Sequence, residues 1–524
     1  REEDMVDLFI PCVHDAGLIF TQREALNYMK ELVKGNTIVH VQNILMNYFM
    51  PQIGELNFNQ KAMYLGYIVK RLLLVKMKLQ KPTDRDSFKY KRVDVPGILM
   101  TELFKEYYNL QLKHVRLQID SQYKYKTAIY RENFIGLIQD RYTEYFKERI
   151  TETGFKKAFK GNWGASENTK KLGVVQDLNR LSYNSFISHL RKINLPMPDT
   201  AKVVKPRLLH GSQWGIIDPV DTPDGGNVGF HKHMAMTCYI TSGYSKFPMI
   251  EWLYNNVDMQ KLEECSPKYI YDNCKLFVNG AWIGMVENPL EIQQFLKKNR
   301  RVGIIPTMTS ISWSINVNEI HIYTDGGRLC RPIFYVDSED KKPSYDKKNI
   351  LEKIKTNNFT WNQLIDGFTD KKDYKKNTLY SLSDLYGKKD FTDLIDEQAI
   401  IDYVDTAEEE TLLIANDEKE LSNNKYFTNL EIHPSLLLGV MGNQVVFPEN
   451  NQLPRDLFAC GQAKQAVSLY HSNYLSRIDK MGVVLNYGQI PLVKSRYMNY
   501  INHEEHPYGE NCIVAIGIYG SYNV

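Results

Sequence analysis

The chain has 524 residues and a mass of 61.0 kDa. This length exceeds what one hydrophobic core usually organises, so several domains of roughly 100 to 150 residues are expected. Apolar residues make up 43% of the chain, which is typical of globular proteins, and 65 Lys and Arg against 62 Asp and Glu leave a net charge of only +3. The net charge does not by itself indicate a nucleic-acid binder, so the local charge pattern has to decide.

The cysteines and the apolar runs indicate the compartment. The seven cysteines are scattered, with no CxxC pair and no histidine pair at ligand spacing, which argues against a disulfide framework and a zinc site. The apolar stretch at residues 63–77 is interrupted by Lys70 and Arg71 and is too short to cross a bilayer. We therefore expect a soluble intracellular protein without membrane contact, and neither end of the sequence resembles a natural terminus.

The first third of the sequence has the periodicity of helices. A helix is predicted at residues 23–29, and a long apolar helix is predicted from Asn59, which can cap it, to Lys78. The same helical spacing recurs between Pro96 and Phe146. This part of the chain is therefore predicted to be mainly helical.

The region after Gly211 has strand-like segments bounded by turn residues. Residues 276–284 have the form of a β-hairpin with an Asn-Gly turn, and a strand at 320–323 leads into a glycine turn. The polar stretch 337–389 predicts solvated helices and loops, and the run 512–519 is again strand-like. This region is predicted to be mixed α/β.

Two segments are strongly charged. Residues 155–215 carry eleven Lys and Arg against three acids, with aromatic residues interleaved, which is typical of a surface that meets phosphates. A solvated basic face with aromatic residues in the core is the alternative. Residues 391–420 carry eleven acids against one Lys, and we expect an acidic surface that avoids phosphate and faces solvent or a basic partner.

The most specific segment reads KPRLLHGSQWGIIDPVDTPDGGNVG at residues 205–229. It resembles the fork region of the second-largest (β-type) subunit of multisubunit DNA-dependent RNA polymerases, where KPRxLH is followed by WG and CPxETPEG. This chain departs at Asp218, where the family has Cys, and at Asp221 and Asp224, where the family has Glu. The resemblance implies a structural role in the fork for Trp214, Asp221, Thr222, Pro223, Asp224 and Gly225.

Further matches to this family follow in the family's order along the chain. They are DRDSFKYKRVD at 84–94, GNWG at 161–164, VQDLNR at 175–180, FVNG at 277–280, TDGGRLCRP at 324–332, DYVDTAEEE at 402–410 and EIHPSLLLG at 431–439. The eukaryotic, archaeal and large-DNA-virus branch is matched better than the bacterial one. The richness in Asn, Tyr, Lys and Ile favours a virus.

The segment NQLPRDLFACGQAKQA at 451–466 is similar to the family's NQSPRNxYxxxxxKQA. In the family the Arg lies beside the triphosphate of the incoming nucleotide, and the resemblance implies this role for Arg455. A guanidinium can bind phosphate oxygens bidentately and stabilise a leaving pyrophosphate, whereas an Arg after Pro is otherwise read as a surface or helix-start residue. Phe458, where the family often has Tyr, is expected close to the substrate or RNA with its ring packing retained. Lys464 and Gln465 are expected on the same helix and would approach the RNA 3′ end or the hybrid backbone, with a solvated helix face as the alternative.

The basic segment supplies the expected nucleic-acid contacts, which are Arg180, Arg191, Lys202, Lys205 and Arg207. Residues 195–204 match the family's downstream-edge fork loop in length. Glu431 and His433 are expected to be structural. The glycine-rich run 225–229 is expected to be a turn, because it lacks the Lys-Ser/Thr of a phosphate loop.

The sequence contains no Asp-x-Asp-x-Asp cluster of the kind that holds catalytic metal ions for nucleotidyl transfer. In the family this cluster belongs to the largest subunit. Mg²⁺ is therefore expected to be held mainly by that subunit, and no metal ligand is assigned to this chain. The family's own acidic pair is expected just beyond Val524.

These observations predict an α+β multidomain protein. The expected domains are the C-terminal part of the lobe at 1–85, the returning part of the protrusion at 86–150, the fork at 151–230, mixed α/β external domains at 231–335 and 336–440, and the start of the β-rich hybrid-binding domain at 441–524. The sequence is read as an internal fragment of a longer subunit.

The resemblance implies a subunit of a DNA-directed RNA polymerase, a nucleotidyltransferase that extends RNA from NTPs on a DNA template. The fragment alone is expected to be inactive. Its expected partners are the largest and smaller polymerase subunits, template DNA, the RNA–DNA hybrid and NTPs, in the nucleus of a eukaryote or in the cytoplasm or virion of a large DNA virus. The alternative is a non-catalytic nucleic-acid-binding scaffold that retains the fold.

Overall fold

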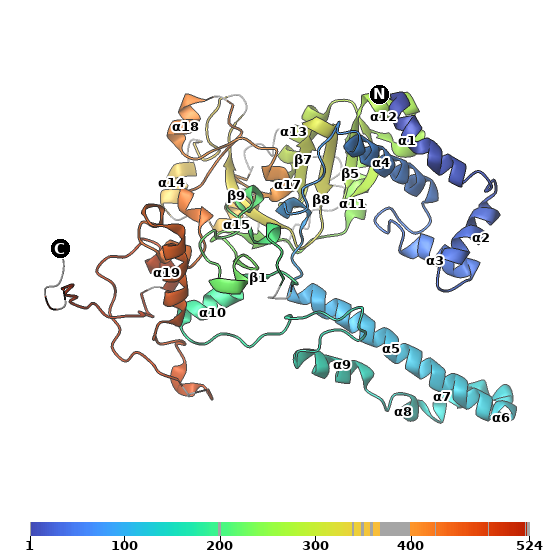
Figure 1. Ribbon diagram of the computed structural model, residues 1–524, viewed down its shortest axis with the longest axis horizontal. Coiled ribbons are helices and arrows are strands. Elements are labelled where there is room, and N and C mark those ends of the chain that lie inside the picture. Colours follow the sequence, from blue (N-terminus) through green and yellow to red (C-terminus); the bar gives the residue numbers. More distant parts are fainter. Residues whose placement is uncertain are drawn as a thin grey trace. The chain divides into compact units, whose positions relative to one another are not determined.

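The computed structural model describes residues 2–197, 201–337, 340–346, 350–356, 360–366, 399–424, 426–479, 482–502, 504–518 and 520 (Figure 1). Its contacts divide the chain into a first unit, Arg1–Lys91 with Tyr239–Pro434, and a second unit, Arg92–Cys238 with Ser435–Val524. Helices and small sheets are mixed, which confirms the predicted α+β multidomain class. The division into six named domains stays a prediction.

The first unit begins with four helices, α1 (Glu2–Asp15), α2 (Gln22–Leu32), α3 (Ile38–Asn47) and α4 (Phe58–Lys76). Helix α2 confirms the helix predicted at 23–29, and Thr21 and Glu24 close its first turn as a capping box. The predicted cap of the long helix was wrong. Helix α4 starts before Asn59, after Asn57, and it ends before Lys78, which has a left-handed φ of 60°.

A five-stranded sheet forms the main core of the first unit. Its order is β4 (Gln260–Lys261), β6 (Ala281–Val286), β5 (Cys274–Val278), β8 (Glu319–Tyr323) and β7 (Ser310–Ser314). Strands β5 and β6 form the predicted hairpin, and the turn residues Asn279 and Gly280 both have positive φ, at 47° and 76°. Helices α11 (Lys246–Asn256) and α13 (Pro289–Val302) contribute Leu253 and Leu296, both fully buried, to the same core.

A second sheet of the first unit joins β10 (Ile401–Asp405), β9 (Leu329–Tyr335), β12 (Asn429–Leu430) and β11 (Ile414–Ala415), with β3 (Tyr239–Ile240) also paired to β9. The acids at residues 391–420 were expected to form a surface that faces solvent or a basic partner. This expectation was wrong for Asp402, Asp405 and Glu408, which are all less than 5% exposed, while residues 391–398 lie outside the described residues.

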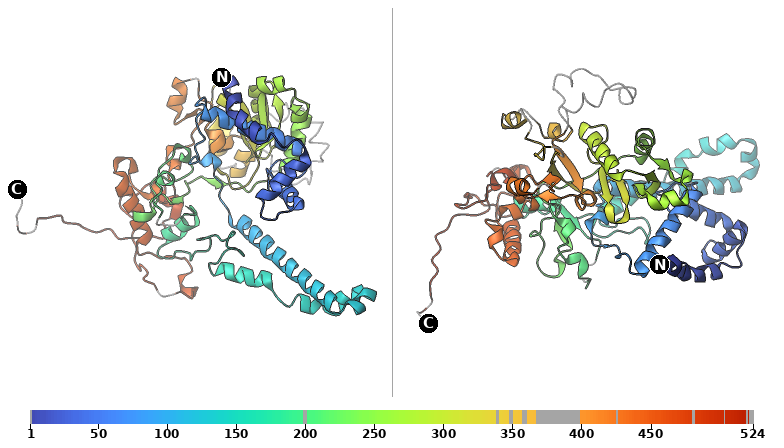
Figure 2. Two further views of the ribbon diagram at one scale, coloured as in Figure 1. Left: turned by 45° about the vertical axis from the view of Figure 1, so that its right-hand side comes forward. Right: turned by 90° about the horizontal axis from the view of Figure 1, so that it is seen from above.

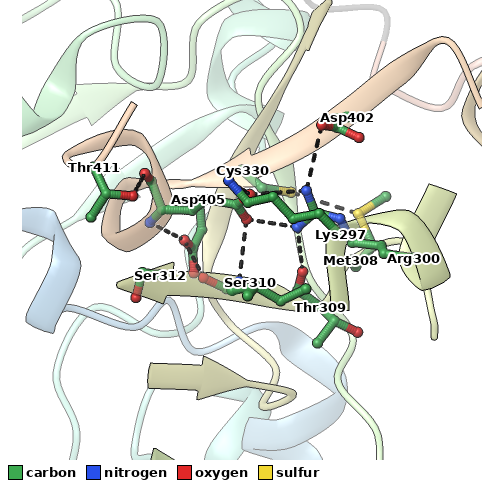
Figure 3. Close-up of polar contacts among 12 residues, drawn as sticks. Lys297, Arg300, Met308, Thr309, Ser310, Ser312, Cys330, Asp402, Asp405 and Thr411 are labelled. Carbon is green, nitrogen blue, oxygen red and sulfur yellow. Dashed lines mark hydrogen bonds and ion pairs between the residues drawn. The ribbon is translucent and has the colours of Figure 1, made fainter. Parts of the chain in front are cut away.

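Buried arginines explain why these acids are inside. The Arg300 guanidinium donates to both carboxylate oxygens of Glu408, at 2.6 and 2.9 Å. It also lies 3.7 Å from the Asp402 carboxylate (Figure 3). Arg301 donates to both carboxylate oxygens of Asp402, at 3.1 and 2.7 Å. Although burial opposes ionisation, Arg301 and Arg300 lower the pKa of Asp402 to about 2. Strand β10 and the short helix α17 (Thr406–Glu409) are therefore joined to α13 by a network of buried ion pairs.

The second unit starts with α5 (Pro96–Tyr125), a helix of 30 residues. The chain turns through α6 (Thr127–Glu132), α7 (Phe134–Gln139) and α8 (Tyr142–Tyr145) and returns along α5 as α9 (Ile150–Phe159) (Figure 2). Leu103, Tyr107, Ala158 and Trp163 form the core between them. Trp163, one of the aromatic residues interleaved in the basic segment, is thus a core residue.

The rest of the second unit carries the predicted site. It contains α10 (Tyr183–Leu190), a two-stranded sheet of β1 (Lys192–Asn194) and β2 (His231–His233), and α19 (Leu453–Gln465). The strand expected at 512–519 is not found among the described residues 482–502 and 504–518, where Ile513 and Ile516 are fully exposed. A strand needs a ladder partner, and the described part of the chain supplies none there.

Across the described residues, no helix has the length and the apolar character that a membrane span requires. The seven cysteines carry free thiols.

Candidate nucleotide and nucleic-acid site

Arg455 lies in the first turn of α19. The helix starts after Gln452, whose carbonyl accepts from the Arg455 N–H at 2.9 Å, and Pro454 stands in the first turn, where a missing N–H costs no hydrogen bond. The Arg455 side chain is exposed and lies over the exposed Phe458 ring, 5.4 Å from the ring centroid. Within the described residues no carboxylate forms an ion pair with it. Arg455 is thus a cation at a helix N-terminus, where the helix dipole favours an anion.

The other end of α19 is held by Ser182 and by residues 205–229, which are called the fork segment after the family region that they resemble. The Lys464 amino group is ion-paired with Asp221, which is 3% exposed, and the Lys464 carbonyl accepts from the Ser182 hydroxyl at 2.6 Å. Gln465, in contrast, is exposed. Of the two residues expected near the RNA 3′ end, Gln465 is therefore accessible, whereas the Lys464 charge is engaged inside the second unit.

Asp221 is the centre of a buried polar cluster. Besides Lys464, it accepts from the Ser188 hydroxyl at 3.2 Å, and its carboxylate lies 3.4 Å from His233 Nδ1. Thr222 donates to the His231 carbonyl at 3.0 Å. These contacts connect the fork segment to α10, β2 and α19.

The remaining predicted fork residues shape a turn. Asp224 accepts from the Gly225 N–H at 2.8 Å and caps the short 3-10 helix Gly225–Asn227, and Gly225 has a φ of 85°. Pro223 is half-buried, and Trp214 is 51% exposed. The glycine-rich run therefore begins as the turn that the sequence predicts.

Asp218 belongs to this site, although in the sequence it stands out only as a departure from the family motif. It is 3% exposed and accepts from the N–H groups of Val220 at 3.1 Å and Gly442 at 3.2 Å. Burial, together with the charge of Asp221, raises the pKa of Asp218 to about 7. Burial lowers the pKa of His233 to about 4, against the influence of Asp221. In the sequence, only the apolar residues next to Asp218 indicate that it could be buried.

The two shifted groups predict the pH dependence of stability. The folded-state pKa of Asp218 is raised, so its contribution to stability is complete below pH 3.8 and is lost as pH rises through about 7. The pKa of His233 is lowered, so its contribution is present above pH 6.5 and is lost as pH falls through about 4. In wild type we expect these two effects on stability to oppose each other between about pH 4 and pH 7. In Asp218→Asn only the effect of His233 remains, so we expect its stability to increase with pH over this range.

Thermal unfolding of wild type and the Asp218→Asn variant, followed between about pH 4 and pH 8, checks this prediction. Identical pH profiles for the two proteins would show that Asp218 does not titrate as its burial implies.

The five predicted nucleic-acid contacts differ in accessibility. Lys202 and Lys205 are exposed. Arg180 lies over the Phe186 ring at 4.4 Å, and Arg191 donates to the carbonyls of Ala235 and Met236, at 2.6 and 3.2 Å. Their contacts with phosphate stay predictions, and the guanidinium of Arg191 is occupied by main chain.

Arg207 braces the fork segment. Its guanidinium lies 3.7 Å from the Phe230 ring centroid and donates to four main-chain carbonyls, those of Ala201, Val203, Gly226 and Val228. A Lys keeps the charge but cannot span these acceptors. We expect Arg207→Lys to cost about 1–3 kcal/mol of local stability, seen as faster hydrogen exchange at residues 201–230.

The exposed Lys205 supplies the control for Arg207. We expect Lys205→Ala to leave hydrogen exchange unchanged and to weaken nucleic-acid binding with a smaller salt dependence. If Arg207→Lys left exchange at 201–230 unchanged, the bracing role of Arg207 would be excluded.

No group of three or more His, Cys, Asp or Glu side chains that could hold a metal ion occurs among the residues that the structure describes.

Comparisons with known proteins point to one family. Family models described as RNA polymerase Rpb2 match the chain in order, with domain 2 at residues 1–94, domain 3 at 176–240, domain 4 at 276–337 and domain 6 at 441–524. The fork segment falls in the match to domain 3, and Arg455 falls in the match to domain 6.

Longer proteins named as RNA polymerase subunits are similar to this chain along almost its whole length. "DNA-directed RNA polymerase II subunit 2" of Arabidopsis thaliana is 32% identical over 100% of this chain and 42% of its own length. "DNA-directed RNA polymerase subunit Rpo2" of Sulfolobus acidocaldarius is 27% identical over 98% of this chain and 43% of its own length. "DNA-directed RNA polymerase subunit 2" of Acanthamoeba polyphaga mimivirus is 29% identical over 99% and 44%. The chain thus spans less than half the length of these relatives.

Proposed function

Because the chain belongs to the family of second-largest RNA polymerase subunits, we propose that its complete protein takes part in DNA-directed RNA synthesis and that Arg455 contacts the triphosphate of the incoming nucleotide. The exposed guanidinium of Arg455 on the first turn of α19 is the observation that carries this proposal. It has the charge, the donors and the helix-end position that suit a phosphate group.

The chemistry proposed for this chain is charge stabilisation. Nucleotidyl transfer builds negative charge on the leaving pyrophosphate, and a guanidinium placed beside it stabilises the transition state. Metal ions assist this reaction by activating the 3′-hydroxyl, and in this proposal Mg²⁺ is held mainly by the largest subunit. No step is assigned to a metal on this chain, since the described residues contain no suitable cluster of ligands.

The domain assignments belong to the same proposal. We assign residues 1–85 to the lobe, 86–150 to the protrusion, 151–230 to the fork and the rest to the external and hybrid-binding domains. Lys202 and Lys205, exposed in the fork, are proposed to border the downstream DNA. The proposed partners are the largest and smaller polymerase subunits, template DNA and the RNA–DNA hybrid, inside the cell.

Purification of the complete parent protein from its native source tests the proposal. We expect a larger subunit with an Asp-x-Asp-x-Asp loop to co-purify, and the assembly to extend RNA from NTPs on a DNA template. An assembly that binds nucleic acid without such a partner and without RNA synthesis would instead support a scaffold that retains the fold.

A further inference from the structure

The buried face of α19 is tied to the fork segment at several points. Its buried or half-buried residues Asp456, Cys460 and Lys464 follow at intervals of four residues, so they lie on one side of the helix. Arg455 precedes Lys464 by nine residues, which places it on roughly the opposite side and about 13 Å along the axis. A change in the tilt or roll of α19 at Lys464 would therefore displace Arg455.

The Asp221 carboxylate that pairs with Lys464 is held in place by other residues. Asp221 receives its hydrogen bonds from Lys464 and from the Ser188 hydroxyl at 3.2 Å, while His233 Nδ1 lies 2.8 Å from the Asp221 carbonyl. The position of the Asp221 carboxylate is thus set by contacts with α10 and β2 as well as by its ion pair with α19. A buried ion pair of this kind adds little net stability but selects one arrangement of the groups around it.

The segment that leads into α19 is held by the same fork segment, residues 205–229. Asp218 accepts from the Gly442 N–H at 3.2 Å, and a Cβ added at Gly439 or Gly442 would stand 2.8 Å from its carboxylate oxygens. Val220, Met441 and Cys460 form the apolar core between these points. The fork segment therefore contacts both the residues that precede α19 and the last turn of the helix.

From these contacts we infer that Asp221, supported by Asp218, is a positioning residue for Arg455, acting through its ion pair with Lys464 at the far end of α19. This inference rests on the proposed contact of Arg455 with the nucleotide. It differs from that proposal because Asp221 itself is buried, so we assign it no contact with the nucleotide.

A double-mutant cycle in the complete polymerase tests the inference. Asp221→Asn keeps the shape of the side chain and removes its charge. We expect it to lower kcat/KM for NTPs by about 10- to 100-fold, because a displacement near 1 Å at a positioning group has an effect of this size. In enzyme that already carries Arg455→Ala, we expect the same change at Asp221 to have no further effect.

Two further variants sharpen the test. Asp221→Glu keeps the charge and should recover most of the lost kcat/KM. Asp402→Asn is the matched control, because Asp402 is an equally buried carboxylate in the first unit, 4% exposed against 3% for Asp221. We expect it to lower stability and to leave kcat/KM per active enzyme unchanged.

The outcomes separate this inference from the function on which it rests. Equal losses from Asp221→Asn with and without Arg455 would overturn the positioning role while leaving the proposed function intact. Normal nucleotide use by Arg455→Ala would overturn both. If Asp221→Asn does not fold, Ser182→Ala removes the 2.6 Å hydrogen bond to the Lys464 carbonyl together with the side-chain cap of α10 at the Ser185 N–H, and the part of its loss that acts through α19 must likewise vanish in the Arg455→Ala background.

Discussion

Replacing Arg455 with Ala in the complete polymerase is expected to lower kcat/KM for NTPs by roughly 30- to 1000-fold, equivalent to about 2–4 kcal/mol of transition-state stabilisation. The side chain is exposed, so the loss should come from the reaction and not from folding. Single-nucleotide addition measured over a range of NTP concentrations gives kcat and KM separately. The kcat/KM of the conservative Arg455→Lys variant should fall between those of wild type and Arg455→Ala, because Lys keeps the charge but loses the planar fork of donors.

Arg149 provides the control for this prediction. It is another exposed arginine of the second unit, with its side chain 77% accessible and, within the described part of the chain, ion-paired only with Glu152 at 3.3 Å. Arg149→Ala should leave nucleotide use unchanged, since surface pairs of this kind contribute about 0–1 kcal/mol. Unchanged elongation kinetics in the Arg455→Ala enzyme would contradict the assignment of Arg455 to the triphosphate.

Local features of the fold could be predicted because they depend on neighbouring residues. The Asn279-Gly280 turn specifies a hairpin, since both positions adopt positive φ at little cost. The start of α19 likewise follows from Pro454 in its first turn. In both cases the residues that decide the structure lie within a few positions of it.

Buried polar contacts could not be predicted, because their partners are remote in the sequence. Asp218 meets Gly442 across 224 positions, and Lys464 meets Asp221 across 243. In the sequence alone, Lys464 is compatible with a solvated helix face, and only the fold brings Asp221 of the fork segment next to it. The same reason explains why a segment rich in acids was expected at the surface: Arg300, the partner of Glu408, is 108 positions away.

The buried Arg300–Glu408 pair should have the largest effect on stability. Arg300→Met removes a guanidinium that is 2% exposed and leaves Glu408, 1% exposed, as a buried carboxylate without its bidentate partner. Breaking one side of such a pair costs about 3–5 kcal/mol. Since the chain has two units and need not unfold in one step, hydrogen exchange of α13 and of residues 401–409 is the suitable measurement.

A second change separates the charge from the packing. In the Arg300→Met protein, Glu408 keeps, among the described residues, only its ion pair with Lys297, at 3.5 Å. Glu408→Gln then removes this buried negative charge while keeping an acceptor for the Ile311 N–H, which lies 3.3 Å from the Glu408 carboxylate. We expect the double variant to be more stable than Arg300→Met alone, because it no longer has a buried carboxylate that has lost its bidentate partner, and the remaining cost is that of lost hydrogen bonds. If the double variant were less stable, the two residues would stabilise the first unit independently, and the cost of removing Arg300 would lie in its 2.7 Å contact with the Thr309 carbonyl and its packing.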